Sequence, residues 1–240
     1  NITDVSAAAH VITADEIRRS GATTIAEALQ LVPGINVARL SRDRYAISSR
    51  GFNERFSNKL LVLVDGRSIY SPLFSGVMWE NQDTVLEDIE QIEVVRGPGA
   101  ALWGTNAMNG VINIVTKNLS SSANSAGARI GSFGSRDLWL QTGGNWQELA
   151  LGFALEHQQS DGDSDRVVSA DQQTVFDRIF GTKASRAPGA LATRYDILNA
   201  HATLQYQGFT WEHWWWQQRD GGLGPGGAQA LDPDGYQKFR

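Results

Sequence analysis

The sequence predicts an α+β unit followed by antiparallel strands of a transmembrane β-barrel. Up to Lys117, short helices with capping signals alternate with short apolar strands. Beyond it, apolar and polar residues alternate with the period of two that marks a strand. The longest uncharged stretch, 97–116, holds Pro98, four glycines and three asparagines, so it is unsuited to a membrane helix. We therefore expect two domains, at 1–118 and 119–240.

Composition indicates a folded chain and narrows its chemistry. The 240 residues are 41% hydrophobic, and 26 acidic against 21 basic side chains give a net charge of −5. This hydrophobic fraction excludes intrinsic disorder, and the acidic balance argues against nucleic-acid binding. The chain has no cysteine, which excludes thiol catalysis, disulfides and cysteine-ligated zinc.

Two short helices are predicted near the start of the chain. Thr13 and Glu16 have the spacing of a capping box that opens the first helix. Thr24 and Glu27 repeat that spacing at the start of the second, and the Pro-Gly pair at 33–34 ends it.

The strands of this region are short apolar runs. Residues 60–64 are continuously apolar, which predicts a strand buried on both faces. Asp65 and Gly66 follow it and favour a two-residue hairpin, because both tolerate positive φ. The other predicted strands are 10–13, 35–38, 45–52, 67–70, 92–95 and 111–115, and 85–89 could form one helical turn.

After a small, polar linker at 119–127 the strands become longer. The clearest alternation sets Leu149, Leu151, Phe153 and Leu155 against Ala150, Gly152, Ala154 and Glu156. We expect the first set to face lipid and the second the interior. Similar alternation occurs at 126–131, 138–143 and 198–206, and an aromatic-rich segment at 209–218 is predicted as a fifth strand. Tight turns are predicted at 143–147 and 207–208, and long polar loops at 160–193 and after 219. Such a pattern is typical of outer-membrane barrels, although a soluble sheet with one wet face is the alternative.

No segment predicts catalysis or a resident cofactor. Residues 99–104 have the spacing of a phosphate loop, but Thr105 stands where a lysine is needed. The four histidines lie in different predicted elements, without metal-ligand spacing. Asp161, Asp163 and Asp165 resemble the start of a calcium loop, whereas the following residues depart from that motif, so a solvated acidic loop is the other interpretation.

Several motifs, in this order, resemble the plug domain of TonB-dependent outer-membrane receptors. They are VITADEI at 11–17, IAEAL at 25–29, VPGI at 32–35, SRGF at 49–52, LVLVDG at 61–66, IEQIEVVRGP at 89–98, LWG at 102–104 and NGVINIVTK at 109–117. One such motif alone would be weak. Their ordered combination over 9–117, followed directly by strands typical of a barrel, is specific.

The resemblance implies an α+β plug domain followed by the first strands of a plugged, 22-stranded barrel in the outer membrane of a Gram-negative bacterium. It implies import of a scarce nutrient, such as a ferric siderophore, haem or cobalamin, with energy from TonB and no cofactor. The TonB box would lie before Asn1. A soluble periplasmic binding or scaffold domain is the alternative function, and nothing indicates an enzyme.

The resemblance also assigns candidate contacts. The apical plug loops would be 39–44, 53–58 and 70–81, where the candidate ligand contacts are Arg42, Arg44, Asn53, Arg55, Tyr70, Phe74 and Trp79. The arginines could attract an anionic chelate and the aromatic residues could pack on its apolar parts; exposed charge and internal packing are the alternatives. Arg50 and Arg96 match arginines that pair with carboxylates on the barrel wall, although a salt bridge within the plug would suit them equally.

Overall fold

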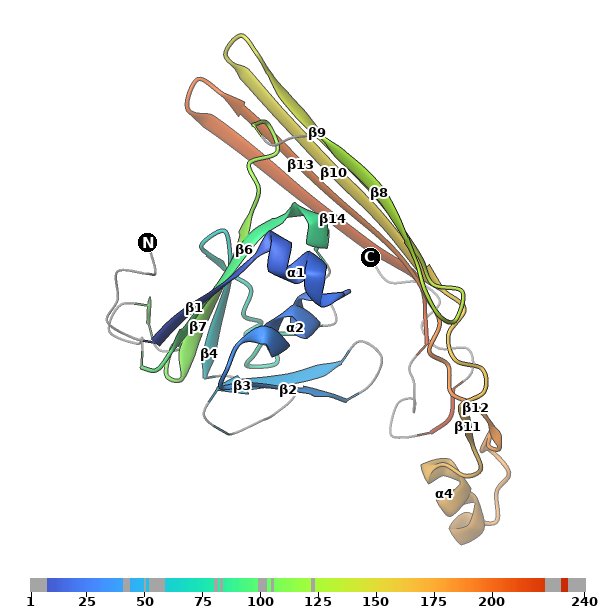
Figure 1. Cartoon of the computed structure of the whole chain (residues 1–240). Coiled ribbons are helices and arrows are strands. Elements are labelled where there is room, and N and C mark those ends of the chain that lie inside the picture. The colour runs from blue at the N-terminus through green and yellow to red at the C-terminus, as the bar shows by residue number, and fades with distance from the viewer. Residues whose placement is uncertain are drawn as a thin grey trace. The chain divides into compact units, whose positions relative to one another are not determined.

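The computed structural model describes residues 8–40, 44–49, 51, 59–79, 82, 84–98, 103–104, 106–121, 124–222 and 230–232. The chain forms two compact units, Asn1–Asn118 and Leu119–Arg240 (Figure 1). Among the described residues, no helix is long and apolar enough to cross a membrane.

A five-stranded mixed sheet organises the first unit. Its order is β1 (Ala8–Thr13), β6 (Ile89–Arg96), β7 (Gly110–Thr116), β4 (Leu60–Val64) and β5 (Arg67–Ser68). Only β4 and β7 pair in parallel. Strands β2 (Ile35–Arg39) and β3 (Tyr45–Ser49) form a separate antiparallel hairpin. All five residues of β4 are buried, which confirms the prediction from its apolar run.

Helix α1 (Ala14–Ser20) has the predicted capping box. Thr13 Oγ1 accepts a hydrogen bond from the Glu16 amide, and Glu16 Oε2 accepts one from the Thr13 amide. The second box forms only in part. The Glu27 amide donates to Thr24 Oγ1 at 3.2 Å, but the Glu27 carboxylate bonds the Thr23 amide instead. The following segment is α2 (Ile25–Ala28) and one 3₁₀ turn, η2 (Leu29–Leu31), where a single helix was predicted.

Apolar side chains fill both sides of the sheet in the first unit. Ile12, Leu29, Ile92 and Ile112 are among the fully buried residues. A second cluster joins Leu61, Leu63, Val95, Ala107 and Val111, with Trp103 packed against it.

The turn between β4 and β5 is the hairpin that the Asp-Gly pair predicts. Asp65 and Gly66 have φ values of 48° and 78°, which suit a tight turn between twisted strands. The Asp65 carboxylate also accepts hydrogen bonds from the amide and hydroxyl of Thr116, both at 2.8 Å. The turn therefore ties β4 to the end of β7.

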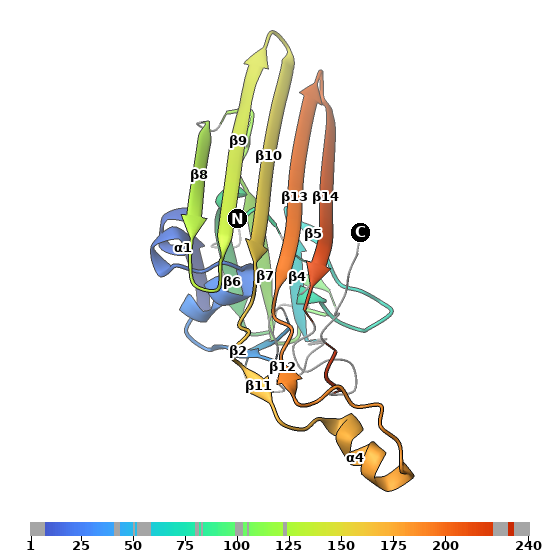
Figure 2. The same cartoon turned by 90° about the vertical axis from the view of Figure 1, so that its right-hand side faces the viewer.

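Five antiparallel strands make up the sheet of the second unit. Their order is β14 (Phe209–Gly221), β13 (Tyr195–Tyr206), β10 (Leu149–Ser160), β9 (Arg136–Trp146) and β8 (Ser125–Ile130); Figures 1 and 2 show them side by side. The turn at Gln207 and Gly208 forms as predicted. The tight turn predicted at 143–147 lies instead at 147–148, because β9 continues to Trp146.

The register gives this sheet one apolar and one polar face. Leu151 and Phe153 are 44% and 37% exposed, whereas Ala154 and Glu156 are 0% and 1% exposed. This confirms that the two alternating sets of β10 lie on opposite faces. Cross-strand pairing aligns Leu151 with Leu204 and Leu155 with Leu140, so neighbouring strands extend the same apolar face.

The segment between β10 and β13 is more ordered than the predicted polar loop. It contains β11 (Val167–Val168), α4 (Gln172–Phe180) and β12 (Gly189–Ala190). Figure 2 shows this segment beyond the ends of β10 and β13. Asp171 caps α4 at its start and Gly181, with φ of 66°, follows its end. Local capping therefore stabilises a helix that its short apolar pattern had not indicated.

Candidate functional site

The β2–β3 hairpin carries one of the predicted basic loops at its tip. Arg44 is half-buried, and its carbonyl accepts a hydrogen bond from the Leu40 amide at 2.8 Å. Arg42 lies outside the described residues, as do Arg50, Asn53 and Arg55. The hairpin brings Arg44 to the same end as Arg39, so two basic side chains share this tip.

A contact between Glu27 and two residues of the hairpin supports that tip. Arg39 Nη1 lies 3.6 Å from Glu27 Oε1, and the Tyr45 hydroxyl donates to the same oxygen at 3.4 Å. Burial raises the pKa of the Tyr45 phenol, and the Glu27 charge raises it further. The phenol therefore stays protonated and can donate, which holds the hairpin against α2.

A second candidate loop is a tight turn with an apolar tip. Ser71 and Gly76 exchange backbone hydrogen bonds of 2.8 and 3.3 Å. Between them, Leu73 and Phe74 are 81% and 42% exposed. Exposed apolar side chains on a turn of this kind are available to pack on an apolar surface.

The predicted aromatic contacts of this loop divide into two groups. Phe74 is exposed and Tyr70 is half-buried, so both can meet a ligand. Trp79 is only 8% exposed and belongs to the buried residues, so its internal-packing interpretation is the one that fits. Leu73 was missed by the sequence analysis; its place between Pro72 and Gly76, both turn-forming residues, was the available signal.

Arg96 lies at the end of β6 and bonds backbone of its own unit. Its Nη1 donates to the Pro33 carbonyl oxygen at 2.7 Å, and its guanidinium packs on Gly34. Gly34 has a φ of 82°, and a Cβ there would lie 3.0 Å from Arg96 Nη1. The side chain thus fixes the turn between η2 and β2. Pairing of Arg96 with a carboxylate of the barrel stays a prediction.

The acidic segment at 161–165 is held by one local hydrogen bond and one to a distant residue. The Asp165 amide donates to Asp163 Oδ1 at 3.1 Å, and the Asp163 amide donates to Thr193 Oγ1 at 2.8 Å. Across the described residues, no three His, Asp or Glu side chains gather closely enough to hold a metal ion. The calcium interpretation of this segment therefore stays a prediction.

Two carboxylates organise the loop around α4. Asp171 accepts from the Ser185 hydroxyl and from the Leu231 amide, which belongs to the segment after β14. Asp177 accepts from the Thr182 hydroxyl and the Ser185 amide. These hydrogen bonds hold the pKa of both carboxyls well below the usual range. Both stay ionised. Asp171 joins the β10–β13 connection to the segment after β14, whereas Asp177 stabilises the β10–β13 connection alone.

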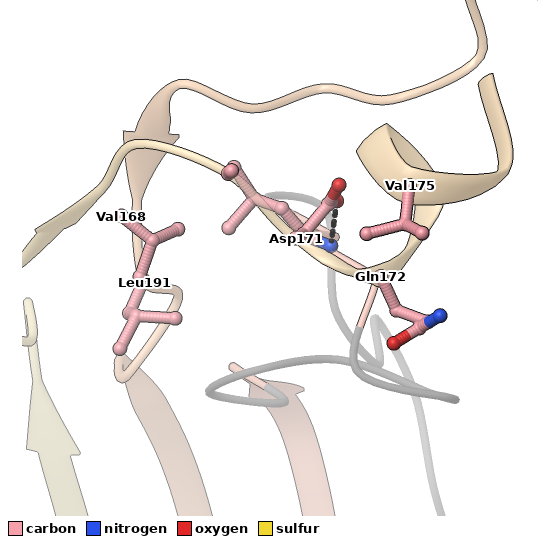
Figure 3. Close-up of a pocket in the computed structure, with 7 residues that line it drawn as sticks. Val168, Asp171, Gln172, Val175 and Leu191 are labelled. Atoms are coloured by element: carbon pink, nitrogen blue, oxygen red, sulfur yellow. Dashed lines mark hydrogen bonds between the residues drawn. The ribbon is translucent and has the colours of Figure 1, made fainter. Parts of the chain in front are cut away.

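An apolar hollow of about 520 Å³ lies beside Asp171 (Figure 3). Its lining residues are mostly apolar: Val168, Ala170, Asp171, Gln172, Val175, Leu191 and Leu231. Figure 3 shows Val168 and Leu191 next to one another and Val175 on the side of α4. On α4, Val175, Phe176, Ile179 and Phe180 are also exposed. This loop therefore offers an apolar surface.

Comparison with known families identifies the first unit. The model of the TonB-dependent Receptor Plug Domain matches residues 1–111. The vitamin B12 transporter BtuB of Vibrio vulnificus (strain CMCP6) is 37% identical over 126 residues, which are 52% of this chain and 20% of that protein. The ferrienterobactin receptor of Escherichia coli (strain K12) is 33% identical over 117 residues, which are 44% of this chain and 16% of that protein.

The similarity to solved structures extends through the second unit of this chain. The ferric yersiniabactin uptake receptor FyuA of Yersinia pestis has a TM-score of 0.60 at 24% identity, covering 88% of this chain and 31% of that chain. The ferric enterobactin receptor PfeA of Pseudomonas aeruginosa, in complex with enterobactin, has a TM-score of 0.61 at 22% identity, covering 89% and 33%. This chain thus spans a fifth or less of the two curated relatives and about a third of the two structures.

Proposed function

We propose that this chain is part of a TonB-dependent receptor that binds a scarce nutrient at the cell surface and imports it across the outer membrane with energy from TonB. The nutrient would be a metal chelate or a vitamin. The relatives named above are a vitamin B12 transporter and receptors for ferric chelates, which supports this range of ligands and selects none of them.

One observation carries the proposal: a plug domain is followed by a sheet with one apolar and one polar face. The apolar face, with Leu151 and Phe153 exposed, suits contact with lipid. The polar face, with Gln141, Glu156 and Asn199 buried, suits the wall of a polar lumen. A wide barrel needs its lumen filled, and a separately folded plug can fill it.

The two plug turns supply complementary ligand chemistry. The sequence that connects β2 and β3 is basic, with Arg42 and Arg44, while the 71–76 turn presents Leu73 and Phe74. A ligand that suits both is an anionic chelate with apolar or aromatic parts. TonB would supply the energy for import, and lipid would contact the apolar face of the barrel.

Neutralising Arg42, Arg44 and Arg55 to Gln should weaken binding of ferric enterobactin, an anionic chelate, by about tenfold, since exposed charge pairs contribute about 0.2–1 kcal/mol each. The remaining binding should depend less on salt, because exposed charges are screened within about 8 Å at physiological ionic strength. Titration at two salt concentrations measures both effects.

The matched control replaces Arg18, Arg19 and Arg67 with Gln. These are exposed plug arginines outside the candidate loops, so the change in net charge is the same as in the first variant. Equal losses in the two triple variants would assign the effect to net charge. An unchanged affinity and salt slope in the first variant would remove these arginines from the site. A lower melting temperature with unchanged affinity would assign them to internal ion pairs.

A soluble periplasmic binding or scaffold protein is the second candidate function, since an antiparallel sheet can also have one wet face. Cell fractionation separates the two. The full-length protein should sediment with outer membranes and need detergent for extraction. Recovery in the soluble periplasmic fraction would support the second function.

A further inference from the structure

Two glycines face each other across β9 and β10 on the polar face of the second sheet. Gly143 pairs with Gly152, and Gly152 pairs on its other side with Thr203 of β13. Their side of each strand also carries Gln141 and Ala154, both buried. The pair therefore leaves a gap in the layer of side chains that covers this face.

The backbone at Leu119, where the chain enters the second unit, occupies this gap. A Cβ built on Gly143 would collide with the Leu119 carbonyl oxygen and lie 2.7 Å from its carbonyl carbon. A Cβ on Gly152 would collide with the Leu119 Cβ and lie 2.6 Å from Thr203 Oγ1. Real Cβ atoms do not approach other atoms so closely, so only glycine at both positions permits this contact.

A hydrogen bond fixes the same segment a few residues later. The Gly143 amide donates to Asn124 Oδ1 at 3.1 Å. Leu119 is 2% exposed and Ser120 is 8% exposed, so the start of the linker is buried.

We propose that Gly143, Gly152 and Asn124 form an anchor for the linker at Leu119, which holds the chain between plug and barrel at a fixed point on the inner wall. The anchor stays occupied while the plug rearranges. Any movement of the plug during import therefore pivots about residues that precede Leu119. The anchor rests on contacts within the second unit, and only its role during import rests on the proposed transport function.

The first test measures whether the glycines hold the linker. Residues 1–240 contain no cysteine, so Ser120→Cys places a single thiol at a buried linker position of this chain. In the full-length receptor in outer membranes, a maleimide should label this thiol slowly. Adding Gly143→Val or Gly152→Leu should make labelling severalfold faster, because the linker must leave the wall.

Gly144→Val is the matched control, since a Cβ at Gly144 meets no atom within 4 Å and the residue lies on the opposite face. In the Gly144→Val variant, labelling of the thiol at position 120 should stay at the parental rate. Equal rates in the Gly143, Gly152 and Gly144 variants would overturn the anchor. Retained heat-modifiable migration of each variant on a gel would show that the barrel itself has folded.

The second test asks whether the anchor stays occupied during import. A short thiol-specific cross-linker should join Leu119→Cys to Thr203→Cys, because both side chains border the space above Gly152. It should not join Leu119→Cys to Ala202→Cys, since Ala202 faces the other side of β13. Failure of the first pair to cross-link, or equal cross-linking of both, would overturn the anchor.

The cross-linked receptor should import radiolabelled ferric enterobactin or vitamin B12, whichever the parent imports, at the parental rate. Loss of import on cross-linking, with recovery when a cleavable linker is cut, would overturn the fixed pivot. If the uncross-linked receptor imports neither probe, the proposed nutrient range fails instead. The labelling rates and the cross-linking yields still decide whether the anchor exists.

Discussion

Replacing Leu151 with lysine is expected to destabilise the full-length protein, by about 2–4 kcal/mol if Leu151 lies near the bilayer midplane, because a charge on the lipid-facing side of a barrel costs that much at this depth. Leu151 is 44% exposed near the start of β10 (Leu149–Ser160), and its neighbours on the same face, Phe153 and Leu204, are apolar. Reversible unfolding in urea, in lipid vesicles, measures the change.

Ala150→Lys is the matched control for this prediction. Ala150 is the adjacent residue of the same strand and points to the opposite, polar face. A lysine there can reach water or polar groups in a barrel lumen, so its cost should be clearly smaller. Equal costs at Leu151 and Ala150 would contradict a lipid-facing surface and favour a soluble sheet.

Replacing Leu29 with alanine is expected to destabilise the first unit by about 2–5 kcal/mol, because a buried leucine leaves a cavity when truncated. Leu29 is 0% exposed, between α2 and β2. Urea unfolding of residues 1–118, produced alone, measures the change and also tests our expectation that this unit folds separately.

Leu31→Ala serves as the control within the same 3₁₀ turn. Leu31 is 41% exposed, so its truncation should change the free energy of unfolding by about 0.5 kcal/mol or less. Similar losses at both positions would mean that Leu31 is also covered. Absence of a cooperative transition in residues 1–118 would contradict a separate folding unit.

Sequence reasoning succeeded where a signal is local. The capping box at Thr13, the Asp65-Gly66 turn and the alternation of β10 each depend on residues a few positions apart. The parallel pairing of β4 with β7 could not be read in this way, because their registers join residues about 50 positions apart. Pairing of distant strands is decided by the whole sheet and not by either segment.

The same limit applied to the candidate site. The 70–81 loop could be located from its motif neighbours, but the burial of Trp79 and the exposure of Leu73 depend on tertiary packing. Helix α4 carried local signals in Asp171 and Gly181, yet its stability also depends on bonds from Asp171 to Ser185 and Leu231. Gly143 and Gly152 were visible as part of an alternation, whereas their contact with Leu119 was not.

Uptake of a bound nutrient with and without TonB tests the central proposal most directly. Cells that make the full-length receptor would be given radiolabelled ferric enterobactin, vitamin B12 or another ferric chelate, and surface-bound and internal label would be measured separately. We expect one of these ligands to bind equally in the presence and absence of TonB and to enter the cell only when TonB is present. Equal entry in a strain that lacks TonB would contradict the proposed function.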